Sequence, residues 1–209
     1  RGGEVDAVGV AWQFGRFEAA PVRATPPLRD RVRALESDLG APLPDGYVSE
    51  INVGLTAWLA SIAAVQRRGV QLFIDYGLPR REYYAAERGM GTLLCHFRHR
   101  FHDDPYTRLG LQDITAWVDF TAVAEAAQAA GLDVAGYTTQ AQFLIGCGIA
   151  DFVADVSDLD VVARVNVSRQ VMVLTLPGEM GERFKVLALA RDYDGDLRGF
   201  ATRDLRHLL

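Results

Sequence analysis

Hydrophobic residues at 70–74 predict a strand that leads into a polar turn. Gln71 is the only polar residue of this run, and Asp75, Tyr76 and Gly77 follow it. A short, almost wholly apolar run fits a strand that is buried on both faces of a parallel sheet. Ligands of open α/β sheets bind beyond the carboxyl ends of the strands, so Asp75 is a candidate ligand-binding residue. A plain turn, which Asp and Gly also favour, is the alternative.

Apolar residues spaced three and four apart predict four helices around this strand. Each predicted helix has a polar N-cap before its first apolar residue or a glycine after its last. The expected ranges are 26–39, 53–68, 120–130 and 140–147. The expected N-caps are Thr25, Asn52, Asp119 or Thr121, and Thr139. Helices that alternate with strands in this way predict an α/β fold.

Three further stretches carry strand patterns. Residues 4–24 predict a β-hairpin because apolar residues alternate with smaller or polar ones, and 133–137 and 184–190 predict single strands. Residues 151–176 are ambiguous: their valines suit a helix, whereas 171–176 also fit a strand.

Residues 78–118 show no regular period. A structureless segment of this length is uncommon in a compact domain, and such segments are often lids or binding loops. The segment holds His96, His99 and His102, followed by two aspartates. Three imidazoles and a carboxylate could bind zinc or iron. Side chains spaced by three drift around a helix, however, so a polar loop without metal is favoured over a metal hydrolase.

Composition and charge exclude several classes of protein. The net charge of −5 gives no broad nucleic-acid footprint. No apolar run approaches the roughly 18 residues of a membrane span, and no signal-peptide pattern is present. The two cysteines are far apart and form no disulfide framework, which favours a reducing compartment.

Three acidic residues remain as candidates for chemistry. Asp119 fits the N-cap of a helix, while Asp113 is equally open to capping and to ligand binding. Glu50 is expected near the end of an extended segment, where a surface role is the alternative. Two glycine pairs, Gly89 with Gly91 and Gly146 with Gly148, do not follow a strand and open a helix. Neither pair is therefore a dinucleotide-binding fingerprint.

Ordered motifs lie at 47–52, 73–77, 79–84, 91–93, 95–105, 112–115, 118–121, 136–140 and 178–181. Taken together, these motifs resemble the MidA family of S-adenosylmethionine-dependent methyltransferases. That family includes the mitochondrial arginine methyltransferase needed for assembling respiratory complex I. The resemblance covers nearly the whole chain from residue 45 onward. Trp117 stands where bacterial relatives usually have histidine, so a histidine role is not available at that position.

The resemblance implies a Rossmann-like class I methyltransferase sheet, of which 1–209 would be one C-terminal portion. The hairpin 4–24 would be an insertion, and 78–118 an inserted lid or substrate loop. The strands at 70–74, 133–137 and 184–190 would be the fifth, the sixth and the antiparallel seventh, with 157–176 mainly helical. The glycine-rich cofactor motif and the acid after the next strand would lie before Arg1, so the cofactor-binding residues are not assigned. Strand 70–74 would then be an exposed edge unless preceding residues cover it.

The resemblance also implies S-adenosyl-L-methionine as cofactor, a protein substrate with a target arginine, and a bacterial cytoplasmic location. Paired carboxylates would hold the guanidinium and orient one nitrogen. The expected catalytic residues are Glu50, Asp75 and Asp113. The expected substrate-binding residues are Tyr76, Gly77, His99, His102 and Gln112. Methyl transfer needs no metal, and a non-catalytic assembly factor that binds a partner protein is the alternative function.

Overall fold

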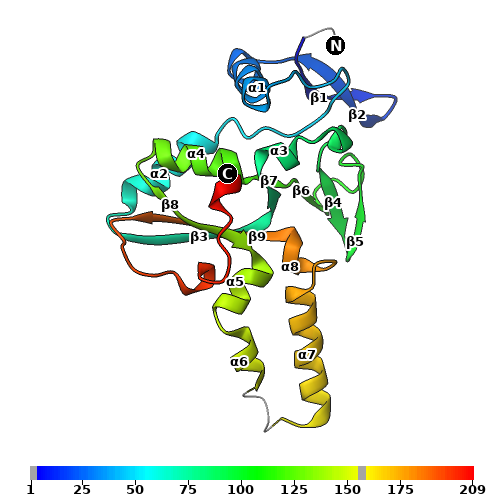
Figure 1. Ribbon diagram of the computed structural model, residues 1–209. Helices are drawn as coiled ribbons and strands as arrows, with labels where there is room; N and C mark the ends of the chain where they lie inside the picture. The colour runs from blue at the N-terminus through cyan, green and yellow to red at the C-terminus, as the bar shows by residue number, and fades with distance from the viewer. Residues whose placement is uncertain (1–3, 155–158) are drawn as a thin grey trace. The chain divides into compact units, whose positions relative to one another are not determined.

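A computed structural model describes residues 4–154 and 159–209 and divides the chain into two compact units (Figure 1). The first unit comprises Arg1–Val53 and Arg81–Trp117. The second comprises Gly54–Arg80 and Val118–Leu209. Among the described residues, no helix has both the length and the apolar character needed to cross a membrane.

A four-stranded mixed sheet organises the second unit. Its strand order is β7 (Val118–Asp119), β3 (Gly69–Leu78), β9 (Phe184–Arg191) and β8 (Asp133–Thr139). Strand β9 is antiparallel to both β3 and β8, and β3 is parallel to β7. The antiparallel last strand therefore lies between the other two long strands, and its direction agrees with the antiparallel seventh strand that the resemblance implies.

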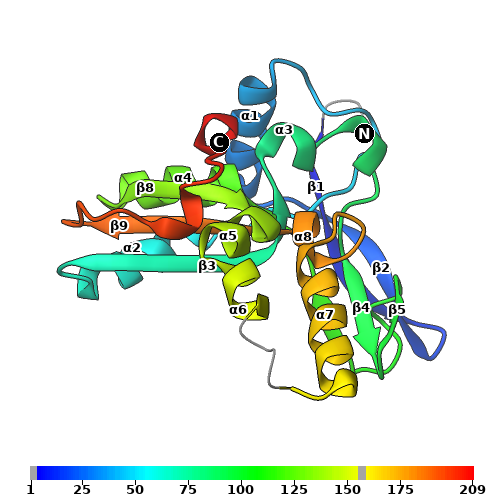
Figure 2. The ribbon, with the colours of Figure 1, turned by 60° about the horizontal axis from the view of Figure 1, so that its bottom comes forward.

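The core of the second unit forms on both faces of β9. Leu187 and Leu189 pack with α2 (Leu55–Val65) and α4 (Phe120–Ala129) on one face. On the other face, Val186 and Ala188 pack with Phe143 of α5 (Gln140–Gly146) and Phe200 of η2 (Arg198–Phe200). The helices accordingly cover the sheet from two sides (Figure 1 and Figure 2). Because successive side chains of a strand point to opposite faces, the apolar segment 186–190 of β9 is buried on both faces.

Strand β3 differs from the buried strand that its sequence predicts. Leu72 and Ile74 are 48% and 50% exposed. One edge of β3 pairs with β9, whereas among the described residues its other edge pairs only at Gly77 and Leu78, with β7. The expectation of an exposed sheet edge at 70–74 is therefore confirmed for the described residues, and the expectation of burial in a parallel sheet is wrong. An apolar run does not reveal whether a strand lies at the centre or the edge of a sheet.

The strand also continues past Ile74. Asp75 lies opposite Lys185 and Tyr76 lies opposite Phe184, so both belong to the ladder with β9. Gly77 allows β7 to approach, because a Cβ there would lie 2.3 Å from the Val118 carbonyl oxygen. The predicted turn at 75–77 is thus the last part of a longer strand.

The other predicted elements agree with the structure except at particular boundaries. Helix α1 (Pro26–Leu39) ends at Gly40, and the side chains of Asp119 and Thr139 cap α4 and α5 as expected. Helix α2 begins at Leu55 with Gly54 as N-cap, so the predicted Asn52 cap is wrong.

The ambiguous region after α5 is mostly helical. Most of 151–176 lies in α6 (Ile149–Ala154) and α7 (Val161–Thr175), and α8 (Met180–Arg183) follows it. Asp160 starts α7 by accepting a hydrogen bond from the Ala163 amide, and the Leu176 amide closes it by donating to the Met172 carbonyl. The helical prediction is confirmed for 161–175 and the strand alternative for 171–176 is wrong, while 155–158 lie outside the described residues.

The first unit contains two antiparallel sheets. Strands β1 (Asp6–Gln13) and β2 (Arg16–Arg23) form the predicted hairpin. Residues 78–118 are not a structureless loop, because they include α3 (Arg80–Tyr83), η1 (Ala86–Arg88) and a three-stranded sheet. The order of that sheet is β5 (Arg100–His102), β4 (Leu94–Phe97) and β6 (Asp113–Thr115). Its strands are too short to show a period in the sequence.

Arg80 ties the end of β3 to the start of α4 in the second unit. Its backbone amide donates to Thr121 Oγ1 at 2.9 Å, and its guanidinium binds both carboxylate oxygens of Glu125. The guanidinium also lies 3.5 Å from the Asp119 carboxylate, and both side chains are largely buried. Burial raises the pKa of Asp119, against the lowering effects of the Ala122 amide and Arg80.

Replacing Arg80 by alanine is expected to lower the free energy of unfolding by about 3–5 kcal/mol, because the substitution leaves the largely buried Asp119 carboxylate without its cation. Urea unfolding followed by circular dichroism measures the change. Arg81→Ala is the matched control: Arg81 is exposed, so its loss should change stability by no more than about 0.5 kcal/mol. Equal effects of the two substitutions would contradict the role of Arg80.

Asp119→Asn tests the pH dependence of this network. The folded state raises the pKa of Asp119 above its ordinary value of 3.8, so the folded protein binds this proton more tightly than the unfolded chain. The free energy of unfolding of the wild type should therefore fall relative to that of the variant as the pH rises from 3.8 through the folded pKa. Above the folded pKa, the difference between the two proteins should stay constant. Asparagine caps helices equally well, which isolates the charge. Urea unfolding over a pH series measures this stability difference. A gain in wild-type stability relative to the variant between pH 3.8 and the folded pKa would contradict the prediction.

Candidate functional site

The carboxylate of Glu50 is held by several donors of the first unit. Its two oxygens accept the Thr92 amide at 3.1 and 3.0 Å and the Leu93 amide at 3.2 Å. The Thr92 hydroxyl donates at 2.9 Å and the Tyr83 hydroxyl lies at 3.2 Å. A carboxylate has about four acceptor positions, so these contacts use most of its capacity.

Gly91 makes this arrangement possible. Its φ is +77°, in the left-handed region, and a Cβ at this position would lie 2.3 Å from Glu50 Oε1. Only glycine fits both the backbone conformation and the close approach of the carboxylate. The turn then presents two successive amides to one anion, which is how backbone groups bind anions in other concave turns.

The Glu50 cluster extends to Trp117 through hydroxyl groups. Thr92 Oγ1 accepts the Trp117 amide at 2.9 Å, and the Tyr83 hydroxyl lies 3.2 Å from the Trp117 carbonyl oxygen. The Tyr84 hydroxyl donates to the Glu50 carbonyl at 3.3 Å. Tyr83 and Tyr84 are buried, with exposures of 2% and 7%. Trp117 thus contributes its backbone groups to this network.

Asp75 has a different environment in the second unit. Its side chain is exposed, and Oδ1 accepts the Tyr76 amide at 2.8 Å. The Tyr76 ring packs on Phe184 across the ladder, with ring centroids 4.1 Å apart. Asp75 therefore presents a solvent-facing carboxylate near the carboxyl end of β3, on a well-paired segment of backbone.

Asp113 and Gln112 lie at the start of β6 in the first unit. Asp113 is exposed and pairs with His96 in the ladder between β6 and β4. Gln112 donates from Nε2 to the Pro105 carbonyl at 3.0 Å. Its Oε1 atom is buried, and in the described part of the chain it has no hydrogen-bond partner.

The three histidines lie on one hairpin but do not converge. His102 is opposite Cys95 and His96 is opposite Phe101, so the alternation of the strands places His96 and His102 on opposite faces. His99 lies in the turn between them, with φ +62°. Within residues 4–154 and 159–209, no group of three or more His, Cys, Asp or Glu side chains could hold a metal ion.

Three residues with a large part in these networks were not predicted as site residues: Arg80, Tyr83 and Thr92. All three fall in motifs of the family resemblance. Their contacts join segments far apart in the sequence, for example Tyr83 to Glu50 over 33 positions. No local pattern could have identified these partners.

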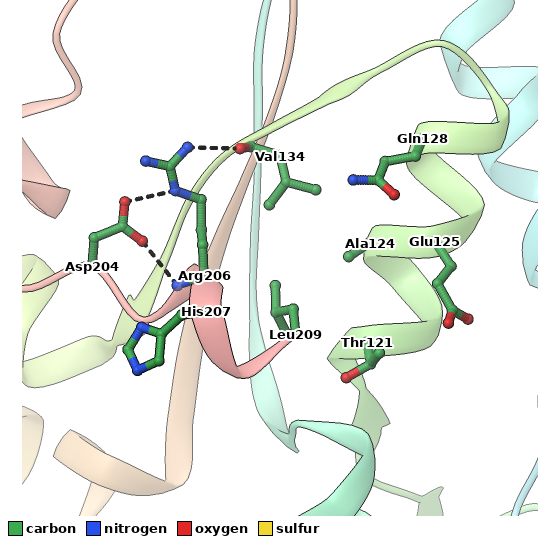
Figure 3. Close-up of a pocket in the computed structure, with 9 residues that line it drawn as sticks. All are labelled: Thr121, Ala124, Glu125, Gln128, Val134, Asp204, Arg206, His207 and Leu209. Atoms are coloured by element: carbon green, nitrogen blue, oxygen red, sulfur yellow. Dashed lines mark hydrogen bonds and ion pairs between the residues drawn. The ribbon is translucent and has the colours of Figure 1, made fainter. Parts of the chain in front are cut away.

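A pocket of about 570 Å³ lies in the second unit between α4 and the C-terminal segment (Figure 3). Thr121, Glu125 and Gln128 line it from the helix. On the opposite wall, Arg206 is paired with Asp204 at 2.7 Å and donates to the Val134 carbonyl at 3.1 Å. The predicted catalytic and substrate-binding residues do not line this pocket.

The mixed sheet with its antiparallel strand β9 between β3 and β8, flanked by helices, defines the second unit as a mixed α/β fold. Residues 4–138 match the family described as "Putative S-adenosyl-L-methionine-dependent methyltransferase". This match covers more than half of the chain, and the chain belongs to that family.

Two solved structures from Burkholderia thailandensis are similar to the chain. One is described as a "likely methyl transferase" bound to S-adenosyl-homocysteine, with 40% identity and a TM-score of 0.89 over 98% of this chain. The other is a native structure of an uncharacterized protein of the same superfamily, with 40% identity and a TM-score of 0.86 over 98% of this chain. The alignments cover 52% and 54% of those chains, so this chain spans about half their length. No curated protein matches the chain.

Glu50→Gln is expected to lower the free energy of unfolding by about 1.5–3 kcal/mol, because an amide cannot accept both backbone amides and the Thr92 hydroxyl. The same substitution should expose the Thr92 and Leu93 amides to faster hydrogen exchange. Asp113→Asn makes the same chemical change at an exposed carboxylate of the same unit and should leave both quantities nearly unchanged. Unchanged hydrogen exchange of the Thr92 and Leu93 amides in Glu50→Gln would show that the Glu50 carboxylate does not protect them.

Proposed function

We propose that this protein is an S-adenosyl-L-methionine-dependent protein arginine N-methyltransferase. The observation that carries the proposal is the family match, joined with a similar structure that binds S-adenosyl-homocysteine. S-adenosyl-homocysteine is what remains of S-adenosyl-L-methionine after its methyl group has been transferred. The arginine target rests on the narrower resemblance to the MidA family, as do the link to respiratory complex I assembly and the bacterial cytoplasmic location.

We infer that this chain does not hold the complete cofactor site. A glycine-rich turn between a strand and a helix, where backbone closely approaches the cofactor, is absent from this sequence. The chain spans about half of the solved structures that it resembles. We therefore assign the main cofactor contacts to residues outside these 209. S-adenosyl-L-methionine supplies, when bound, a methyl group activated by its sulfonium.

The residues of this chain would act on the guanidinium of the target arginine. Arginine stays protonated at neutral pH because its pKa exceeds about 12, so the site must hold a cation and orient one nitrogen. Carboxylates do both through charge-assisted hydrogen bonds. Asp75 and Asp113 are exposed and suit this task, each in its own unit. His99 and His102 remain candidate proton acceptors or substrate contacts.

Glu50 fits a different part of the same proposal. Its carboxylate is already occupied by the Thr92 and Leu93 amides and by two hydroxyl groups. We assign it the positioning of the turn at Gly91 and of Tyr83. Its negative charge would still favour a nearby cation, but its hydrogen bonds are directed to the protein.

Asp75→Asn in the full-length enzyme is expected to reduce the rate of arginine methylation roughly ten- to a hundred-fold. The amide keeps the shape and removes the charge that pairs with the guanidinium, and one charge-assisted hydrogen bond is worth about 1.5–3 kcal/mol. Transfer of a radiolabelled methyl group to an arginine-containing partner protein measures the rate. Asp133→Asn, at the exposed first residue of β8, is the matched control and should retain full activity.

Calorimetry with S-adenosyl-L-methionine separates the possible roles. The affinity of Asp75→Asn for the cofactor should equal that of the wild type. If Asp75→Asn loses affinity for the cofactor, Asp75 binds the cofactor and not the substrate. If the variant methylates at the wild-type rate, Asp75 is not part of the site. A full-length wild type that binds the cofactor but methylates no arginine would favour the alternative function of a non-catalytic assembly factor.

A further inference from the structure

The hairpin β1–β2 has an inverted distribution of side chains. Its large apolar residues face solvent: Val8, Val10 and Trp12 are 63%, 61% and 63% exposed. The residues between them are small and half-buried: Ala7, Gly9 and Ala11. Directly opposite residues of a hairpin share a face, so the register extends the exposed face across β2. The members of this exposed apolar face are Val8, Val10, Trp12, Phe17, Ala19 and Pro21.

The two outer edges of the hairpin differ in their capacity to pair. Pro21 has no N–H group and lies opposite Val8, which marks this pair as a non-hydrogen-bonded one. Hydrogen-bonded and non-hydrogen-bonded pairs alternate along an antiparallel ladder, so the pairs of Val10 and Trp12 are also non-hydrogen-bonded. The N–H and C=O groups of Val8, Val10 and Trp12 therefore point away from β2, towards the outer edge of β1. In the described part of the chain, this edge pairs with no other strand.

Strand β1 has the features of an edge that accepts another strand, whereas β2 has those of an edge that resists one. Between Ala7 and Gln13, β1 contains neither proline nor a charged residue. The outer edge of β2 is interrupted by Pro21, and β2 carries Arg16 and Glu18 near its start. Prolines and charges on edge strands are the devices by which proteins prevent unwanted pairing.

We propose that β1 pairs with β1 of a second copy of this chain, antiparallel about a two-fold axis. In the register that fits, Val10 lies opposite Val10 of the partner subunit and Val8 lies opposite Trp12 of the partner subunit. This register uses the outward N–H and C=O groups of the even-numbered residues. It also keeps both apolar faces on the same side, whereas a shift by one residue would place them on opposite sides.

The same geometry limits the assembly to two copies. An interface related by a two-fold axis uses the same patch on both subunits, and β1 is complementary to itself in this way. The pairs in this register oppose no like charges: Ala7 with Gln13, Val8 with Trp12, Gly9 with Ala11 and Val10 with itself. The resulting four-stranded sheet ends in two β2 strands, whose edges Pro21 protects from further addition.

Sedimentation equilibrium of the full-length protein with Val10→Lys tests the proposal. Wild type should form a dimer, and the substitution should weaken dimerisation by on the order of a hundred-fold or more, because it places a charge at the symmetry axis in both subunits. Val22→Lys is the matched control, since Val22 is 52% exposed and belongs to the opposite face of the hairpin. It should dimerise like the wild type.

Val10→Pro is a second, backbone-level variant. The Val10 N–H points away from β2, so proline should leave the hairpin intact and remove the central donor of the intermolecular ladder. Thermal melting at low protein concentration shows whether the variants fold. Dimerisation of both Val10 variants with wild-type affinity would overturn the proposal, as would a monomeric wild type at tens of micromolar.

Cross-linking identifies the paired residues. In a Cys147→Ser background, Val10→Cys treated with a short bis-maleimide should give a covalent dimer, whereas Val22→Cys should not. Cys95 is fully buried and should not react. If Val10→Cys gives no dimer, or if Val10→Lys lowers the melting temperature without changing the mass, the apolar face is covered by another part of the same protein and the proposal fails.

Discussion

The second unit depends on one strand, β9, which is the shared hydrogen-bonding partner of β3 and β8. Its residues from Val186 to Ala190 are at most 2% exposed, and they supply the centre of the apolar clusters on both faces of the sheet. Strand β9 lies antiparallel between β3 and β8, although β3 and β9 are more than a hundred positions apart in the sequence. The helices on either side then pack against side chains that this strand fixes.

Two carboxylate networks perform comparable structural tasks, one in each unit. Asp119 caps α4 and lies beside Arg80, and Glu50 accepts the amides of the turn after Gly91. Both satisfy backbone N–H groups that would otherwise be unpaired near the interior, which is costly. This use of acidic residues for structure separates them from the exposed Asp75 and Asp113, whose oxygens face solvent.

The distinction bears on the proposed arginine methylation, in which the site would bind a cationic substrate. A carboxylate whose acceptor positions are filled by its own protein can contribute charge and rigidity, but few directed hydrogen bonds. An exposed carboxylate on a paired strand has acceptor positions that can bind a substrate, and its backbone is already ordered. Exposure and hydrogen-bond saturation therefore rank Asp75 and Asp113 above Glu50 as direct contacts to a guanidinium.

The sequence by itself determined the local features of this protein. Periodicity, caps and turns predicted the hairpin, α1, α4 and the apolar strands, because these depend on neighbouring residues. Three features follow from no local pattern and depend on the tertiary structure. Strand β3 lies at an edge while the equally apolar β9 is central, residues 78–118 form a small sheet, and Glu50 is enclosed by donors from Tyr83 and Thr92. Each depends on pairing between segments far apart in the chain, which no local pattern of apolar and polar residues encodes.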